Sequence, residues 1–143
     1  MSLEIIPRDV EGIAILDLQG QLTFGQEDLD FRAELDHLVK AGRLRVALNF
    51  SHLRKLDTTG LGTLLFALAK LQKAGGKLAI FEMNPTHLSL LAEARLETVF
   101  EVFHDEPDAI DSFFPDRDNR HFDILEFVES EKHKGVRMPD VSN

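Results

Sequence analysis

An acid, two hydroxyls and two glycines stand together where a short alternating stretch gives way to a leucine-rich one. This segment reads Asp57-Thr58-Thr59-Gly60-Leu61-Gly62. Asp57 is of a type that caps helices, because its carboxylate accepts hydrogen bonds from the free N–H groups of a first turn. A threonine hydroxyl in that turn can accept a phosphoryl group, which the same N–H groups and the helix dipole favour. The segment therefore combines a helix cap with a possible modification site.

Two predicted elements position this segment. Residues 45–50 alternate their side chains as a partly buried strand does. Leucines then recur at spacings of three and four, which predicts a helix with one apolar face. They are Leu61, Leu64, Leu65, Leu68 and Leu71. The helix is expected to stop at Ala74-Gly75-Gly76.

The segment also has a purely structural interpretation. Asp57 caps the helix and the threonines fill its first turn whether or not anything binds there. Glycine costs a helix about 1 kcal/mol relative to alanine, so Gly60 and Gly62 suggest that something approaches the backbone closely. That neighbour is either an adjacent strand or a partner's surface, and the sequence leaves both open. A phosphate loop is not indicated, since no lysine follows the glycines.

The charge balance argues against a nucleic-acid partner. The chain has 143 residues, of which 25 are acidic and 16 basic, for a formal net charge of −9. A phosphate backbone would be repelled unless the cations were clustered. The densest groups are only pairs, Arg43 with Arg45 and Lys132 with Lys134. We therefore expect no binding to nucleic acid.

Other classes of function lack the residues they need. Cysteine is absent, which removes disulfides and thiolate chemistry. The histidines show no pair at the helical spacing of a zinc site, and no nucleophile, base and orienting group can be assembled. We expect no enzyme, no metal site and no cofactor, with every histidine on the surface. No apolar run approaches the ~20 residues that a bilayer requires, which favours a soluble, cytoplasmic protein without a membrane partner.

Strands alternate with helices along the chain, which predicts an α/β fold with a mostly parallel or mixed sheet. Strands are expected over residues 3–8, 12–18, 45–50, 77–81 and 98–103. Helices are expected over residues 24–40, 58–73, 85–96 and 106–114. The first of these helices would be capped by Thr23 in a capping box, and the third by Asn84.

The chain divides into a domain of residues 1–114 and a tail of residues 115–143. The tail begins with a charged linker, and residues 121–134 predict a further amphipathic helix. Its apolar face consists of Phe122, Leu125 and Val128. We expect this helix to dock on its own domain or on a second copy, which would give a homodimer.

The segment from Asp57 to Gly62 resembles the signature of STAS domains, the anti-sigma-factor antagonists of bacterial partner-switching systems. The resemblance extends through Gly20-Gln21-Leu22, Gly75-Gly76-Lys77 and residues 96–103, and covers residues 3–114. It implies a mixed sheet of four to five strands, with helices packed mainly on one face, and no catalysis by the domain. It also implies that the segment contacts an anti-sigma factor that is a serine/threonine kinase.

In this family, phosphorylation of the hydroxyl residue directly after the signature Asp breaks the complex, and here that residue is Thr58. The family more often has serine at this position and commonly has an acid near the position of Thr23. Two other functions therefore stay open. One is a non-switching scaffold subunit of a stress-signalling complex. The other is a small-ligand or nucleotide-binding module that uses the helix start at Gly60 and Gly62 as an anion site.

Overall fold

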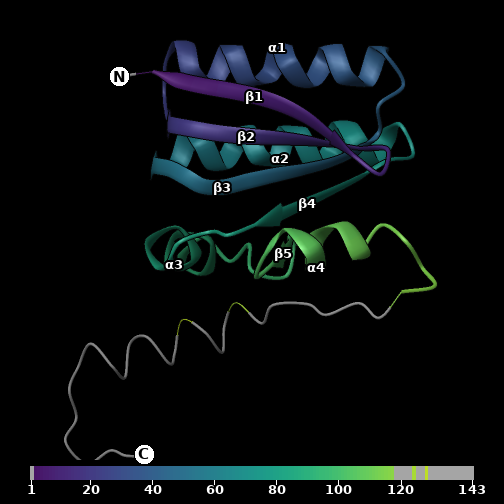
Figure 1. Cartoon of the computed structure of the whole chain (residues 1–143). Coiled ribbons are helices and arrows are strands. Elements are labelled where there is room, and N and C mark those ends of the chain that lie inside the picture. The colour runs from purple at the N-terminus through teal and green to yellow at the C-terminus, as the bar shows by residue number, and fades with distance from the viewer. Residues whose placement is uncertain (1, 118–123, 125–127, 129–143) are drawn as a thin grey trace, which may run out of the picture.

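The structure, a computed structural model shown in Figure 1, describes residues 2–117 together with residues 124 and 128. Strands and helices alternate along this part of the chain. They are β1 (Leu3–Val10), β2 (Ile13–Leu22), α1 (Gln26–Lys40), β3 (Arg45–Leu56), α2 (Thr58–Lys73), β4 (Lys77–Phe81), α3 (Pro85–Glu93), β5 (Glu101–Phe103) and α4 (Glu106–Asp111). Among these residues no helix is long and apolar enough to cross a membrane.

The strands form one mixed sheet in the order β1-β2-β3-β4-β5. β1 runs antiparallel to β2, whereas β3, β4 and β5 each run parallel to the strand before them. Helices α1, α2 and α3 make the crossovers that parallel neighbours require. The predicted α/β fold is therefore confirmed. β2 and β3 are parallel, so their carboxyl ends lie side by side. The loop after β2 and the start of α2 therefore lie at the same end of the sheet.

Each face of the sheet has a hydrophobic core, and the two differ in size. On β2 the side chains of Ala14 and Leu16 belong to the larger core, and those of Ile13 and Ile15 to the smaller. Buried residues of α1, α2 and α3 complete the larger core, whereas α4 covers the smaller one with Ile110 among others. Helices thus pack mainly on one face, as expected.

β3 extends to Leu56, although the alternating pattern predicts its end at residue 50. The extension pairs with the end of β2, where the register shifts between Asp17 and Gln19 and again between Gly20 and Gln21. These irregularities break the two-residue period of buried side chains, which is the pattern on which the predicted boundary rests. The predicted boundary was wrong for this reason.

The capping box at Thr23 is also wrong. α1 begins at Gln26, and its N-cap is Gly25, whose φ of 126° suits glycine and whose position offers no side-chain cap. Thr23 is buried instead, and its hydroxyl accepts a hydrogen bond from Gln21 Nε2 at 3.2 Å. Asn84, by contrast, caps α3 as predicted, accepting from the His87 N–H at 2.8 Å.

Three elements near the end of the domain are shorter than predicted. α3 ends at Glu93 rather than residue 96, because the chain turns where the Leu96 N–H donates to the Leu91 carbonyl at 2.9 Å. β5 starts at Glu101 rather than residue 98, because the chain first turns where the Val99 N–H donates to the Leu96 carbonyl at 3.0 Å. α4 ends at Asp111, and the following residues form further turns, with the Phe113 N–H donating to the Ile110 carbonyl at 3.0 Å.

Two tail residues are described, and both are buried. Ile124 and Val128 belong to the larger core, four residues apart as on one side of a helix. Val128 is one of the residues predicted to dock, whereas Ile124 was not on the predicted apolar face. Phe122, Leu125 and the rest of the predicted tail helix lie outside the described residues. The domain boundary and the homodimer stay predictions.

Candidate functional site

Asp57 caps α2 as predicted, and its carboxylate does more than cap. Its backbone is extended, with φ −117°, and Oδ1 accepts a hydrogen bond from the Gly60 N–H at 2.9 Å. The second oxygen, Oδ2, accepts from the Phe24 N–H at 3.1 Å. One carboxylate therefore ties the first turn of α2 to the loop that follows β2, across 33 residues of sequence.

The two glycines of the segment have different surroundings. A Cβ on Gly60 would lie 2.3 Å from the Leu22 carbonyl oxygen and 2.6 Å from Leu56 Cδ1, so α2 packs on the strand ends without room for a side chain. A Cβ on Gly62 would meet nothing within 4 Å. Gly60 is thus explained by packing within the domain, whereas Gly62 leaves the helix surface open to a partner.

Of the two threonines, Thr58 is the more accessible. Thr58 is exposed in the first turn of α2, while Thr59 is half-buried and its carbonyl accepts from the Thr63 hydroxyl at 3.0 Å. Leu61 is buried in the larger core. The structure therefore presents the Thr58 hydroxyl at the surface, directly after the capping Asp57.

The first turn has few free amides for an anion. The Gly60 N–H is bonded to the Asp57 side chain, and the Leu61 N–H donates to the Asp57 carbonyl at 3.0 Å. Three N–H groups precede the intrahelical bonds, and because that of Gly60 is taken by Asp57, those of Thr58 and Thr59 are left for an anion. This arrangement weakens the hypothesis that the glycines form a preformed anion site.

One exposed face of α2 begins at Thr58. Thr58, Gly62 and Leu65 are four and then three residues apart, so they lie above one another on the helix. Leu65 is 38% exposed. Beside the start of this face stands Phe24, which is 81% exposed. We call Phe24, Thr58, Gly62 and Leu65 the switch face.

The sequence pattern did not reveal the apolar part of this surface. Leu65 belongs to the predicted core stripe of α2, yet more than a third of it is exposed, and Phe24 is part of the predicted capping box. Leu29, in α1, is 58% exposed as well. The exposure of Phe24 could have been inferred from its place in a loop rich in turn residues, because an isolated apolar residue in such a loop has no core to join.

A half-buried polar cluster links α1 to α2. The Asp28 carboxylate accepts hydrogen bonds from the Thr63 hydroxyl and from Arg32 Nε, the latter at 2.7 Å. Burial raises the pKa of Asp28, but the hydrogen bonds from Thr63 and Arg32 outweigh burial and lower it overall. The Arg32 guanidinium also lies 4.5 Å from the centre of the Phe66 ring.

The expectation that every histidine lies on the surface fails at His87. His87 is 2% exposed, in the first turn of α3, and its ring meets the Phe50 ring edge-on at 6.2 Å between centroids. Burial lowers its pKa, which a hydrogen bond with the Arg54 backbone partly offsets. His121 and His133 lie outside the described residues. Within the described part of the chain, no three histidine or acidic side chains gather as metal ligands would.

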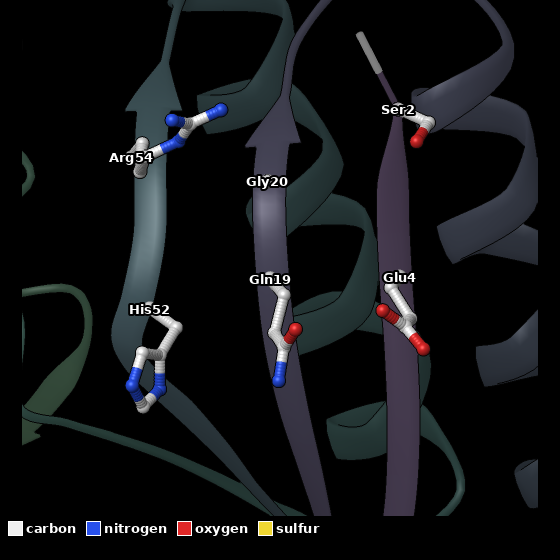
Figure 2. A pocket seen from close by; sticks show the side chains of 6 residues that line it. All are labelled: Ser2, Glu4, Gln19, Gly20, His52 and Arg54. Carbon is white, nitrogen blue, oxygen red and sulfur yellow. The ribbon is translucent and has the colours of Figure 1, made fainter.

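An open hollow of about 410 Å³ lies across β1, β2 and β3, away from the switch face. Figure 2 shows its lining side chains arranged over three neighbouring strands around Gly20. They are Ser2, Glu4, Gln19, His52 and Arg54. All five are exposed polar residues, whereas small-molecule sites are mostly apolar and enclosed. The hollow therefore offers little support for the small-ligand hypothesis.

Comparison with known sequences points in one direction. The chain matches the family model of the STAS domain over residues 4–109. It is 25% identical over 111 residues to the anti-sigma F factor antagonist of Paenibacillus polymyxa, an overlap of 77% of this chain and 94% of that protein.

Solved structures share the fold. An anti-sigma factor antagonist from Mycobacterium paratuberculosis superposes with a TM-score of 0.68 at 17% identity, covering 77% of this chain and 92% of that one. The anti-sigma factor antagonist SpoIIAA in its unphosphorylated form gives 0.61 at 15% identity, covering 80% and 99%. Bacillus SpoIIAA in its phosphorylated form gives 0.60 at 20% identity, covering 78% and 98%.

At these identities the structures establish the fold, including the mixed sheet with helices mainly on one face. The sequence comparison adds an antagonist as a distant relative. Antagonists of this kind are regulators rather than enzymes. Since the family model spans most of the sequence, this chain belongs to the STAS domain family.

Proposed function

We propose that this protein is a cytoplasmic regulator of the anti-sigma-factor antagonist type, and that it binds a kinase-type anti-sigma factor through the switch face. Phosphorylation of Thr58 ends this binding. The observation that carries the proposal is the exposed Thr58 hydroxyl, placed directly after the capping Asp57 and on a surface with apolar side chains. A distant relative and a structural neighbour are both named as anti-sigma factor antagonists, and a neighbour is described in a phosphorylated form.

The modification needs a phosphoryl donor, which a kinase partner supplies as a bound nucleoside triphosphate. The Thr58 oxygen forms a bond to the γ-phosphorus as the bond to the diphosphate breaks. The hydroxyl proton passes to a base of the partner. Nothing in this step requires a catalytic group from the STAS domain, which fits a regulator that is a substrate of its own partner.

The effect of the phosphate depends on where it sits. It adds about −1.5 to −2 charges at neutral pH. On the free domain, the helix dipole offsets its cost by ~0.3 to 1 kcal/mol, so the fold tolerates it. In an interface shaped for a neutral hydroxyl, the same group must lose its water. A loss of about 3 kcal/mol there weakens binding roughly a hundredfold.

The direct test is intact-mass measurement of the protein purified from its native cell, followed by mapping of the modified residue. We expect a fraction that carries one phosphate, and we expect it on Thr58. Phosphate on Thr59 alone, or no phosphorylated fraction under any growth condition, would contradict the switch.

The second candidate is the non-switching scaffold. It is favoured by the threonine at position 58, where members of the family more often have serine. A scaffold binds its partners whatever happens at this position. The same mass measurement separates the two functions, because only the switch requires a phosphorylated fraction.

A further inference from the structure

Phe24 is held in an unfavourable position for a side chain of its kind. It is the most exposed large apolar residue among residues 2–117, at 81%. Leaving such a ring in water forgoes the transfer free energy that its burial would gain. Exposed aromatic rings on ordered backbone are frequent anchors of protein interfaces, because they offer a large contact area with few torsions to fix.

The backbone of Phe24 is tied to α2 through Asp57. Its N–H donates to Asp57 Oδ2, and the other oxygen of the same carboxylate holds the Gly60 N–H. On the strand side, the contact of Gly60 with the Leu22 carbonyl fixes the distance between α2 and the end of β2. The loop of residues 23–25 is thus attached to the end of β2 on one side and hydrogen-bonded to the Asp57 carboxylate on the other.

We propose that Asp57 is a positioning residue that presents Phe24 to the partner, and that negative charge on residue 58 releases Phe24. This inference deepens the proposed function and rests on it. The partner should accordingly offer an apolar pocket that receives an aromatic ring beside the site of the Thr58 hydroxyl.

The release follows from competition within the first turn. A phosphate on Thr58 is adjacent to the Asp57 carboxylate, and both are attracted to the same N–H groups at the start of α2. The two anions repel each other, so the carboxylate gives up part of its bonding. The bond to Phe24 is the more vulnerable one, since it is exposed and longer than the bond to Gly60.

Asparagine at position 57 separates positioning from capping. Asparagine caps helices about as well as aspartate, but it has one acceptor oxygen where the carboxylate has two. Asp57→Asn can therefore keep the Gly60 bond and cannot also hold the Phe24 N–H. Asp105 provides a matched control, because it caps α4 through a single bond to the Asp108 N–H at 3.0 Å.

The experiment measures backbone order parameters and amide exchange of the full-length ¹⁵N-labelled protein by NMR. The variants are Asp57→Asn, Thr58→Glu, the uncharged control Thr58→Gln and the capping control Asp105→Asn. In Asp57→Asn and Thr58→Glu, we expect the Phe24 order parameter to fall from about 0.85 toward 0.6 or below. We expect its amide to exchange roughly tenfold faster, a change in free energy of about 1.4 kcal/mol. The Gly60 amide should stay near its parent value, the melting temperature should fall by no more than a few degrees through loss of the one exposed bond, and both controls should behave as the parent.

Two outcomes overturn the inference. One is a Phe24 amide as ordered in Asp57→Asn and Thr58→Glu as in the parent. The other is equal loosening in Thr58→Gln, which would assign the effect to side-chain size rather than charge. Failure of the proposed function looks different, because Thr58 then carries no phosphate in the native cell whatever Phe24 does in these variants.

Discussion

α2 and α4 begin in the same way and end up with different roles. Each follows an aspartate in extended backbone whose Oδ1 accepts from the N–H three residues later, at 2.9 Å for Asp57 and 3.0 Å for Asp105. After Asp105 comes Glu106, whose carboxylate is bonded to Arg8 Nη2 at 2.7 Å. After Asp57 comes Thr58, whose uncharged side chain is exposed.

The difference shows that a helix cap alone carries no function. The first side chain of α4 is engaged in contacts within the domain, since Glu106 joins Arg8 and Asp17 in an ion-pair network. At the start of α2, Thr58 is exposed, and the second carboxylate oxygen of Asp57 binds the backbone of an exposed aromatic residue, Phe24. What surrounds the cap therefore decides its use, and the following predictions test that statement.

The largest effect is expected from charge at position 58. Thr58→Glu should weaken binding to the purified kinase-type partner about a hundredfold, for the desolvation reason given above, and leave the melting temperature nearly unchanged. Thr58→Ala should bind and resist phosphorylation, and Thr59→Ala should still accept phosphate. Calorimetric titration and thermal melting measure the two quantities.

A matched control for Thr58→Glu exists in α3. Thr86 is an exposed threonine in the first turn of a helix capped by Asn84, so Thr86→Glu makes the same charge change at a comparable helix start. We expect it to bind as the parent does. Equal weakening by both variants would show that net charge, and not the place of the charge, controls binding.

The next effect concerns Phe24. Phe24→Ala should weaken partner binding at least tenfold, since burial of an aromatic ring in an interface contributes about 1.5 to 3 kcal/mol. Because the ring is exposed in the free domain, thermal stability should not fall. Val99, an exposed apolar residue in the loop before β5, supplies the control Val99→Ala. Unchanged affinity in Phe24→Ala would remove the aromatic anchor from the switch face.

Asp57 and Asp105 should differ in how much their replacement by alanine lowers the free energy of unfolding, because Asp57 makes a second hydrogen bond. Asp57→Ala leaves two N–H groups without their acceptor and should cost about 1 to 2 kcal/mol of unfolding free energy. Asp105→Ala leaves one and should cost about 0.5 to 1 kcal/mol. Chemical denaturation of both variants measures this comparison, and a larger loss in Asp105→Ala would reverse it.

The smallest effect is a dependence on pH through Asp28. Hydrogen bonds from Thr63 and Arg32 lower the pKa of Asp28 in the folded protein. Its contribution to the free energy of unfolding is therefore complete above the ordinary carboxyl range and is lost as the pH falls through the folded pKa. Between pH 6 and pH 3, the melting temperature should therefore fall less steeply with pH in Asp28→Asn than in the parent. The variant should itself cost about 1 kcal/mol at neutral pH. Parallel curves would exclude this role of Asp28.

Local patterns predicted most of the fold, because the elements follow their periods closely. The burial of Leu64 and Leu71 on α2 and the cap at Asn84 are consequences of residue types a few positions apart. The extension of β3 could not be seen, since register shifts against β2 disturb the alternation. His87 is buried because α3 packs beside β3 through the Phe50 ring, which is a tertiary contact without a local signal.

Only the local part of the candidate site could be predicted, because a sequence pattern spans only a few positions. Asp57 as a cap is a local inference, and the segment from Thr58 to Gly62 follows from it. The bond from Asp57 to Phe24 joins residues 33 positions apart, so no short pattern contains it. Gly60 and Gly62 read alike in the sequence and differ only in what a neighbouring strand end brings close to them.

The sequential order of the strands has a consequence for how the protein is made. Each strand pairs with the one synthesised just before it, so the sheet can grow at one edge as the chain leaves the ribosome. Phe24, Asp57 and α2 all precede β4 and β5. The surface that we propose for partner binding therefore lies entirely on segments that are synthesised before these two strands.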